Sequence, residues 1–109
     1  KIKTALGING VTTNIFSWFG KGAECSAQID MVIDRADNVV NLCEMKFYNK
    51  PYTMTKKDAD SIERKVATFM ESTQTEKNVI VTLITAKGLE HNEYSECIQK
   101  EITLEDLFC

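Results

Sequence analysis

The sequence of 109 residues predicts a domain of the α/β class, and three observations lead to this prediction. Two β-rich segments, 27–35 and 39–48, flank a short polar turn, which is typical of an antiparallel hairpin. Residues 55–73 carry apolar side chains at the spacing of an amphipathic helix. The apolar run 78–85 follows that helix and is short enough to be a buried strand. A helix that leads into such a strand implies a crossover and a mixed sheet.

The first half of the chain predicts the end of a helix and three strands. Residues 1–7 have the pattern of a helix tail, and residues 11–19 predict a first strand, closed by the turn Gly20-Lys21-Gly22. The two strands of the hairpin then follow. The third strand ends before Pro51, which cannot donate to a ladder.

The hairpin turn decides which side chains share a face of the sheet. A three-residue loop, Ala36-Asp37-Asn38, pairs the two residues that flank it, and Asp and Asn tolerate the left-handed backbone that the loop needs. Continued along both strands, this register places Asp30 opposite Glu44, with Cβ atoms roughly 5 Å apart. It also places Gln28 opposite Lys46. Because side chains alternate along a strand, these four residues are expected on one face.

The second half of the chain predicts a long helix followed by short elements. The run Thr55-Lys56-Lys57-Asp58 has the pattern of a capping box at a helix start. Residues 92–99 predict a short helix, 101–103 a last strand and 103–106 the cap of a terminal turn. The buried stripe of the long helix is predicted to consist of Ala59, Ile62, Val66, Phe69 and Met70.

Composition is that of a cytoplasmic globular domain without a membrane span. Hydrophobic residues make up 43% and charged residues 27% of the chain, and no apolar run approaches the length of a transmembrane helix. The cysteines have neither Cys-x-x-Cys spacing nor histidine partners, so reduced packing thiols are favoured over disulfides or zinc ligands. They are Cys25, Cys43, Cys97 and Cys109.

Charge is unevenly distributed along the chain. The formal net charge is −3, which disfavours general DNA binding, yet residues 46–65 contain six basic against three acidic side chains. This basic stretch directly follows the charged strand 39–48. A solvated helix face is the favoured interpretation, and a nucleic-acid groove is the alternative.

Asp30, Glu44 and Lys46 are charged residues inside hydrophobic strands, where a charge is costly without a partner. Two carboxylates as close as the register predicts would repel each other, and a hard divalent cation would remove the conflict. Two acids, a lysine and a metal are the equipment of metal-assisted phosphodiester hydrolysis. The alternative is a buried salt-bridge cluster without a metal.

At these residues the chain resembles the PD-(D/E)XK phosphodiesterase superfamily, which has the restriction-endonuclease-like fold. The family signature, an acid on one strand and acid-any-lysine on the next, is matched by Asp30 and by Glu44-Met45-Lys46. Residues 28–47, 78–85 and 101–108 are similar to the C-terminal domain of certain bacterial and archaeal AAA-type ATPases. The resemblance extends from about Thr12 to the end of the chain.

The resemblance implies a mixed β-sheet core flanked by helices in the order α-β-β-β-α-β, with a truncated N-terminal helix. It implies one nuclease-like domain over residues 1–109, as a C-terminal fragment of a longer ATPase. Asp30 and Glu44, with the Met45 carbonyl, would bind Mg²⁺ or Mn²⁺, and Lys46 would serve catalysis. DNA and the ATPase part of the same chain are the implied partners. Many members carry a further acid on the first helix, and none is present in residues 1–7.

Several other side chains are candidates for contact with phosphate or DNA. They are Gln28, Lys50, Lys56, Lys57 and Lys65. For Lys65 a lysine that extends to solvent is favoured over one that reaches the metal face. Tyr48 and Tyr52 could stack on bases, although aromatic residues at a strand end more often cover a core. Two functions therefore remain: a Mg²⁺-dependent DNA hydrolase, or an inactive module of the same fold that binds DNA or a partner protein and regulates the ATPase.

Overall fold

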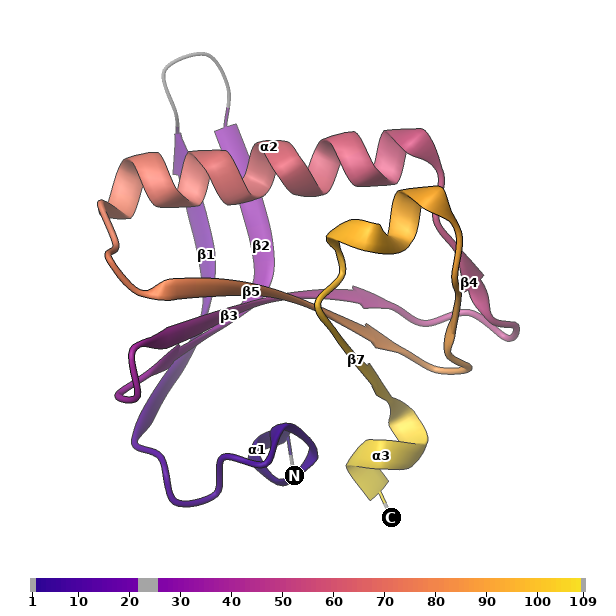
Figure 1. Ribbon diagram of the computed structural model, residues 1–109, viewed down its shortest axis with the longest axis horizontal. Coiled ribbons are helices and arrows are strands. Elements are labelled where there is room, and N and C mark those ends of the chain that lie inside the picture. Colours follow the sequence, from indigo (N-terminus) through magenta and orange to yellow (C-terminus); the bar gives the residue numbers. More distant parts are fainter. Residues whose placement is uncertain (1, 22–25, 109) are drawn as a thin grey trace.

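A five-stranded mixed sheet separates two helical layers in the computed structural model, which describes residues 2–21 and 26–108 (Figure 1). The long helix α2 and the 3-10 helix η1 cover one face of the sheet, and the short helices α1 and α3 cover the other. The elements are α1 (Ile2–Leu6), β1 (Thr13–Lys21), β2 (Ser26–Arg35), β3 (Val39–Lys46), β4 (Tyr52–Thr53), α2 (Lys56–Thr73), β5 (Asn78–Thr85), β6 (Leu89–Glu90), η1 (Glu93–Cys97), β7 (Lys100–Thr103) and α3 (Leu104–Phe108).

The hairpin β2–β3 has the predicted loop and register. Asn38 adopts the left-handed conformation, with φ of 67°, and the ladder runs from Asp34 opposite Val40 to Met31 opposite Cys43. These pairs belong to the register that the three-residue loop predicts. The described ladder ends at Met31–Cys43, one residue short of the expected pair of Asp30 and Glu44.

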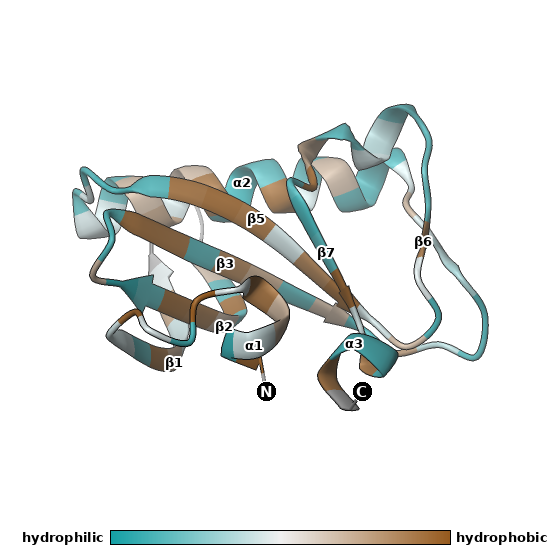
Figure 2. Ribbon diagram, turned by 60° about the horizontal axis from the view of Figure 1, so that its bottom comes forward, coloured by the Kyte–Doolittle hydropathy of each residue, from teal (hydrophilic) through white to brown (hydrophobic). Residues whose placement is uncertain are grey.

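Helix α2 carries the chain from β3 across the sheet to β5, which lies parallel to β3. The predicted capping box is confirmed: Thr55 Oγ1 accepts from Asp58 N–H at 3.3 Å, and the Asp58 carboxylate accepts from Thr55 N–H at 2.9 Å. Strand β7 adds parallel to β5, so the order across the sheet is β1-β2-β3-β5-β7. The central strands β3 and β5 are largely hydrophobic, because helices cover both of their faces (Figure 2).

The core divides between the two faces of the sheet. Phe69 of α2 packs against Ile29, Val32 and Leu42, while Ile33 and Cys43 point to the opposite side. Trp18 meets the Phe69 ring edge-on, with ring centroids 5.2 Å apart. The described helices include none that is both long and apolar enough to cross a membrane.

Some predicted details are wrong at the ends of elements. Strand β1 continues through Gly20 to Lys21, so these residues are not a turn; residue 22 lies outside the described part of the chain. A side chain at Gly20 would meet the Trp18 ring, which explains the glycine. Met70 is exposed rather than buried, because it lines an open groove between α2 and β5 instead of packing into a core cluster. The short parallel pair β4–β6 was not predicted.

Candidate functional site

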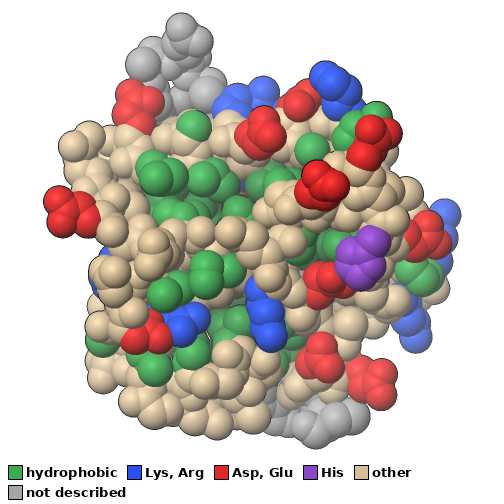
Figure 3. Space-filling model, in the orientation of Figure 1, with side chains coloured by type: hydrophobic (Ala, Val, Ile, Leu, Met, Phe, Trp, Pro, Cys, Tyr) green, Lys and Arg blue, Asp and Glu red, His purple; other side chains and the backbone are tan. Residues whose placement is uncertain are grey.

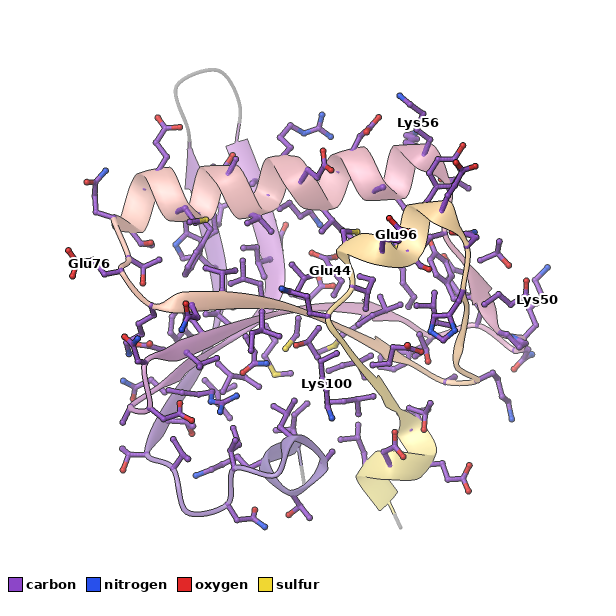
Figure 4. The ribbon with its side chains drawn as sticks, in the orientation of Figure 1. Glu44, Lys50, Lys56, Glu76, Glu96 and Lys100 are labelled. Carbon is purple, nitrogen blue, oxygen red and sulfur yellow. The ribbon has the colours of Figure 1, made fainter. Side chains whose placement is uncertain are left out.

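Glu44 is a nearly buried carboxylate on the central strand β3, with 8% of its surface exposed. It lies beneath α2, near the middle of the molecule (Figure 4). Lys65 of α2 donates to both of its oxygens, at 3.0 and 3.1 Å. The less favoured interpretation of Lys65 is therefore the correct one, since its ammonium group turns inward to the acid.

Burial raises the pKa of Glu44 above its usual value. The hydrogen bond and charge of Lys65 and the charge of Lys46 lower this pKa, while the nearby Asp30 charge raises it. The net direction is upward. This position therefore disfavours an unpaired carboxylate, and Lys65 and Lys46 offset only part of the free-energy cost of burying its charge.

Asp30 lies at an irregularity of the ladder between β1 and β2. Phe16 pairs with Val32 and Trp18 pairs with Ile29, so two residues of β2, Asp30 and Met31, stand opposite a single residue of β1. This β-bulge leaves Asp30 exposed, and its Oδ2 accepts from the Met45 N–H at 3.1 Å. The side chain of Asp30 thus links β2 to β3 beyond the end of the backbone ladder. Its partner, Met45, is the residue whose carbonyl is expected to bind the metal.

Lys46 shares the face of Glu44, as the strand alternation predicts. Both side chains line a small pocket of about 30 Å³, together with Tyr52, Asp58 and Lys65. The Lys46 ammonium lies 5.8 Å from the centroid of the Tyr52 ring, in cation–π contact. Burial raises the pKa of Asp58, but hydrogen bonds from Thr55 and Tyr52 and the Lys46 charge outweigh it, so this pKa is lowered.

A second, more open hollow of about 290 Å³ adjoins this pocket. Asp30 and Gln28 line it from β2, and Ser61, Arg64 and Lys65 line it from α2. Because Lys65 and Ser61 line both spaces, the hollow of Asp30 adjoins the pocket of Glu44. All three signature residues therefore lie near one another, and the charges of Asp30 and Lys46 both act on Glu44.

The remaining candidates for phosphate contact lie further out. Lys50 and Lys56 project at the end of the molecule beyond β3 (Figure 4). Lys56 forms an exposed ion pair with Asp60 at 3.3 Å, which contributes little to stability. Lys57 is exposed on the first turn of α2. Gln28 pairs with Phe19 in the β1–β2 ladder and lines the hollow beside Asp30.

The donor atoms of this site fit Mg²⁺ or Mn²⁺ in type. Asp30 and Glu44 offer carboxylate oxygens, and the Asp30 charge is one of the causes that raise the pKa of Glu44. Hard cations bind one or two carboxylates and keep several waters. The described residues contain no group of three or more acidic, histidine or cysteine side chains placed to hold a metal. Asp30, Glu44 and the Met45 carbonyl would hold the ion, and it would displace Lys65 as the partner of Glu44.

A larger hollow lies elsewhere on the described surface. It is an apolar groove of about 570 Å³ between α2 and β5, lined by Val66, Val79 and Met70 among others, and Figure 3 shows apolar side chains along it. Glu63 and Lys77 lie at its border, and Lys77 is already bound to Asp34 at 2.6 Å.

The described cysteines behave as predicted. Cys43 and Cys97 are free thiols, and burial raises the pKa of Cys43 to about 12, so its thiol stays protonated. Cys25 and Cys109 lie outside the described residues.

Comparison with known proteins supports the fold. A solved structure described as "Crystal Structure of Protein of Unknown Function AF1548" is similar to this chain, with a TM-score of 0.57 and 20% identity. The similarity covers 93% of this chain and 53% of the other, so the chain spans about half the length of that protein. No family model and no curated protein matches the sequence. At this identity the likeness extends to the mixed α/β fold alone.

Proposed function

We propose that the domain is a Mg²⁺-dependent DNA phosphodiesterase of the restriction-endonuclease-like type. One observation carries the proposal: two carboxylates, Asp30 and Glu44, and two lysines, Lys46 and Lys65, surround adjoining hollows at the carboxyl end of β3. Ligands of open α/β sheets bind beyond the carboxyl ends of parallel strands, and β3 is parallel to β5. The helix, three strands, helix and strand of this chain are compatible with the proposed topology.

Each residue has a role that follows from its position. Asp30 and Glu44 would hold the cation, which supplies Lewis-acid polarisation and an activated water when bound. Lys46 would stabilise negative charge on the phosphate, since its ammonium group reaches the pocket from the same face as Glu44. Lys65 pairs with Glu44, and a cation bound to Glu44 would release Lys65 to the phosphate. DNA is the proposed substrate, and the ATPase part of a longer chain is the proposed partner.

Cleavage of DNA tests this proposal. Linear, branched and single-stranded DNA are incubated with the domain in Mg²⁺ or Mn²⁺, beside the variants Glu44→Gln and Lys46→Ala. We expect cleavage that requires the metal and falls by about a hundredfold or more in both variants. The exposed Glu76→Gln at the far end of the molecule is the matched control (Figure 4). Cleavage that both site variants retain would refute the assignment.

A second function is favoured by a different observation. Glu44 is already satisfied by two hydrogen bonds from Lys65, and the described residues contain no group of three or more acidic, histidine or cysteine side chains placed to hold a metal. An inactive module that binds DNA or a partner protein would keep such a salt bridge. Absence of any cleavage, together with DNA binding that Glu44→Gln leaves unchanged, would favour this module.

A further inference from the structure

Beside the signature residues lies a pair of stacked aromatic rings, and we propose that this pair binds an unstacked base of single-stranded DNA. The rings of Tyr48 and Tyr52 lie 5.4 Å apart at an interplanar angle of 15°. The inference deepens the proposed function, because it names the form of DNA that the same site would take.

Tyr52 is the fixed member of the pair. It is half-buried, and its hydroxyl donates to Asp58 Oδ2 at 2.7 Å, which ties the ring to the first turn of α2. Lys46 lies over the same ring. The tyrosine pair is therefore continuous with the pocket of Glu44 and Lys46, since Tyr52 lines that pocket.

Tyr48 is the exposed member, with 52% of its surface accessible. One face of its ring is covered by Tyr52, so the accessible area includes the opposite face. A shallow hollow of about 210 Å³ adjoins the pair and is lined by Tyr48, Tyr52, Pro51 and Lys50. A planar π-face beside such a hollow suits a nucleobase, because every base can stack on an aromatic ring. The ring is already supported by its neighbour, so little order has to be gained on binding.

Charge around the pair favours a phosphate-bearing ligand. Lys46, Lys50 and Lys57 lie at this end of the molecule, together with Lys56, which is paired with Asp60. Asp58 is engaged by Thr55 and Tyr52, and Glu90 accepts from Thr53 at 2.9 Å. Thr53 itself also lines the hollow beside the rings, and its hydroxyl holds the Glu90 carboxylate in a hydrogen bond.

The form of the nucleic acid follows from the need for a free base. Bases of a duplex are stacked on their neighbours, and freeing one costs a few kcal/mol. The tyrosine pair, a fixed aromatic platform next to the candidate phosphate site, therefore favours a single strand over an intact duplex.

Binding is measured by fluorescence anisotropy in EDTA, so that cleavage does not intervene. The probes are an oligothymidylate, an abasic strand with the same number of phosphates, and a duplex. We expect the oligothymidylate to bind at least about tenfold more tightly than the abasic strand, and Tyr48→Ala to remove this difference. Tyr48→Phe should retain it. Phe16→Ala, which truncates an exposed aromatic residue on the distant edge strand β1, is the matched control.

Each outcome decides the proposal. Equal affinity for the oligothymidylate and the abasic strand would overturn it, and so would a Tyr48→Ala variant that is folded by circular dichroism and keeps the preference. Loss of the preference in Tyr48→Ala alone would establish the platform. This test can fail independently of the proposed function. Base-dependent binding without metal-dependent cleavage would refute the hydrolase only. Cleavage that is unaffected by Tyr48→Ala, with no base-dependent binding, would refute base stacking on the tyrosine pair only.

Discussion

At the scale of single residues, the molecule is defined by an acid that burial disfavours. Glu44 lies in a central strand under a helix, and the ammonium group of Lys65 from that helix offsets part of the free-energy cost of its charge. The neighbouring Asp30 avoids the same cost because it remains exposed at a β-bulge. The pair thus combines one buried and one accessible carboxylate, an asymmetry that is typical of functional sites.

The pH dependence of stability should report the burial of Glu44. Because its pKa is raised in the folded protein, the protonated form favours folding. This contribution is complete below the unfolded-state pKa of about 4.3 and is lost as the pH rises through the folded-state value. Glu44→Gln does not titrate, so its free energy of unfolding should increase relative to wild type between about pH 4 and pH 7.

Urea denaturation at several pH values, with Glu76→Gln as control, measures this difference. A relative stability of Glu44→Gln that decreases as the pH rises would contradict the upward direction of the Glu44 pKa.

A double-mutant cycle measures the Glu44–Lys65 pair. Lys65→Met removes the cation and leaves a nearly buried carboxylate, so we expect a loss of about 1–3 kcal/mol at neutral pH. In the Glu44→Gln background the same change should cost at least about 1 kcal/mol less, because no charge is left unpaired. Additive effects of the two substitutions would show that the ion pair contributes nothing.

At the scale of elements, the hairpin β2–β3 places Glu44 and Lys46 on the helix-covered face. Its three-residue loop could be predicted, since Asn38 is a residue that accepts left-handed backbone. The predicted register holds over the described ladder. The β-bulge could not be predicted, because it depends on β1: it lets both Ile29 and Val32 contact Phe69, and it moves Asp30 outward.

The left-handed turn residue gives a prediction for this hairpin. Asn38→Ala should destabilise the domain by about 1–2 kcal/mol, because a Cβ without a compensating polar group disfavours positive φ. Asn38→Gly should be close to wild type, since glycine adopts this conformation freely. Thermal unfolding of both variants measures these changes in stability. Equal losses of stability in the two variants would indicate that the Asn38 side chain, rather than its backbone conformation, stabilises the turn.

At the scale of the whole molecule, the crossover by α2 assembles the site. The sequence pattern predicted α2, β5 and their connection, because the capping box and the apolar periodicity are local signals. It did not predict that Lys65 would bind Glu44, because the rotation of α2 over the sheet depends on long-range packing of Phe69 and Ile62. The stacking of Tyr48 on Tyr52 likewise depends on the short strand β4, which pairs with β6 from a distant part of the chain.

A metal titration tests whether Asp30 and Glu44 together bind a divalent cation. Mn²⁺ is titrated calorimetrically into the wild-type domain and into Asp30→Asn and Glu44→Gln, with Glu76→Gln as control. We expect a binding event in the wild type and the control that is lost in both site variants. Absence of binding in the wild type, or binding that persists in Asp30→Asn and Glu44→Gln, would contradict a metal site between β2 and β3.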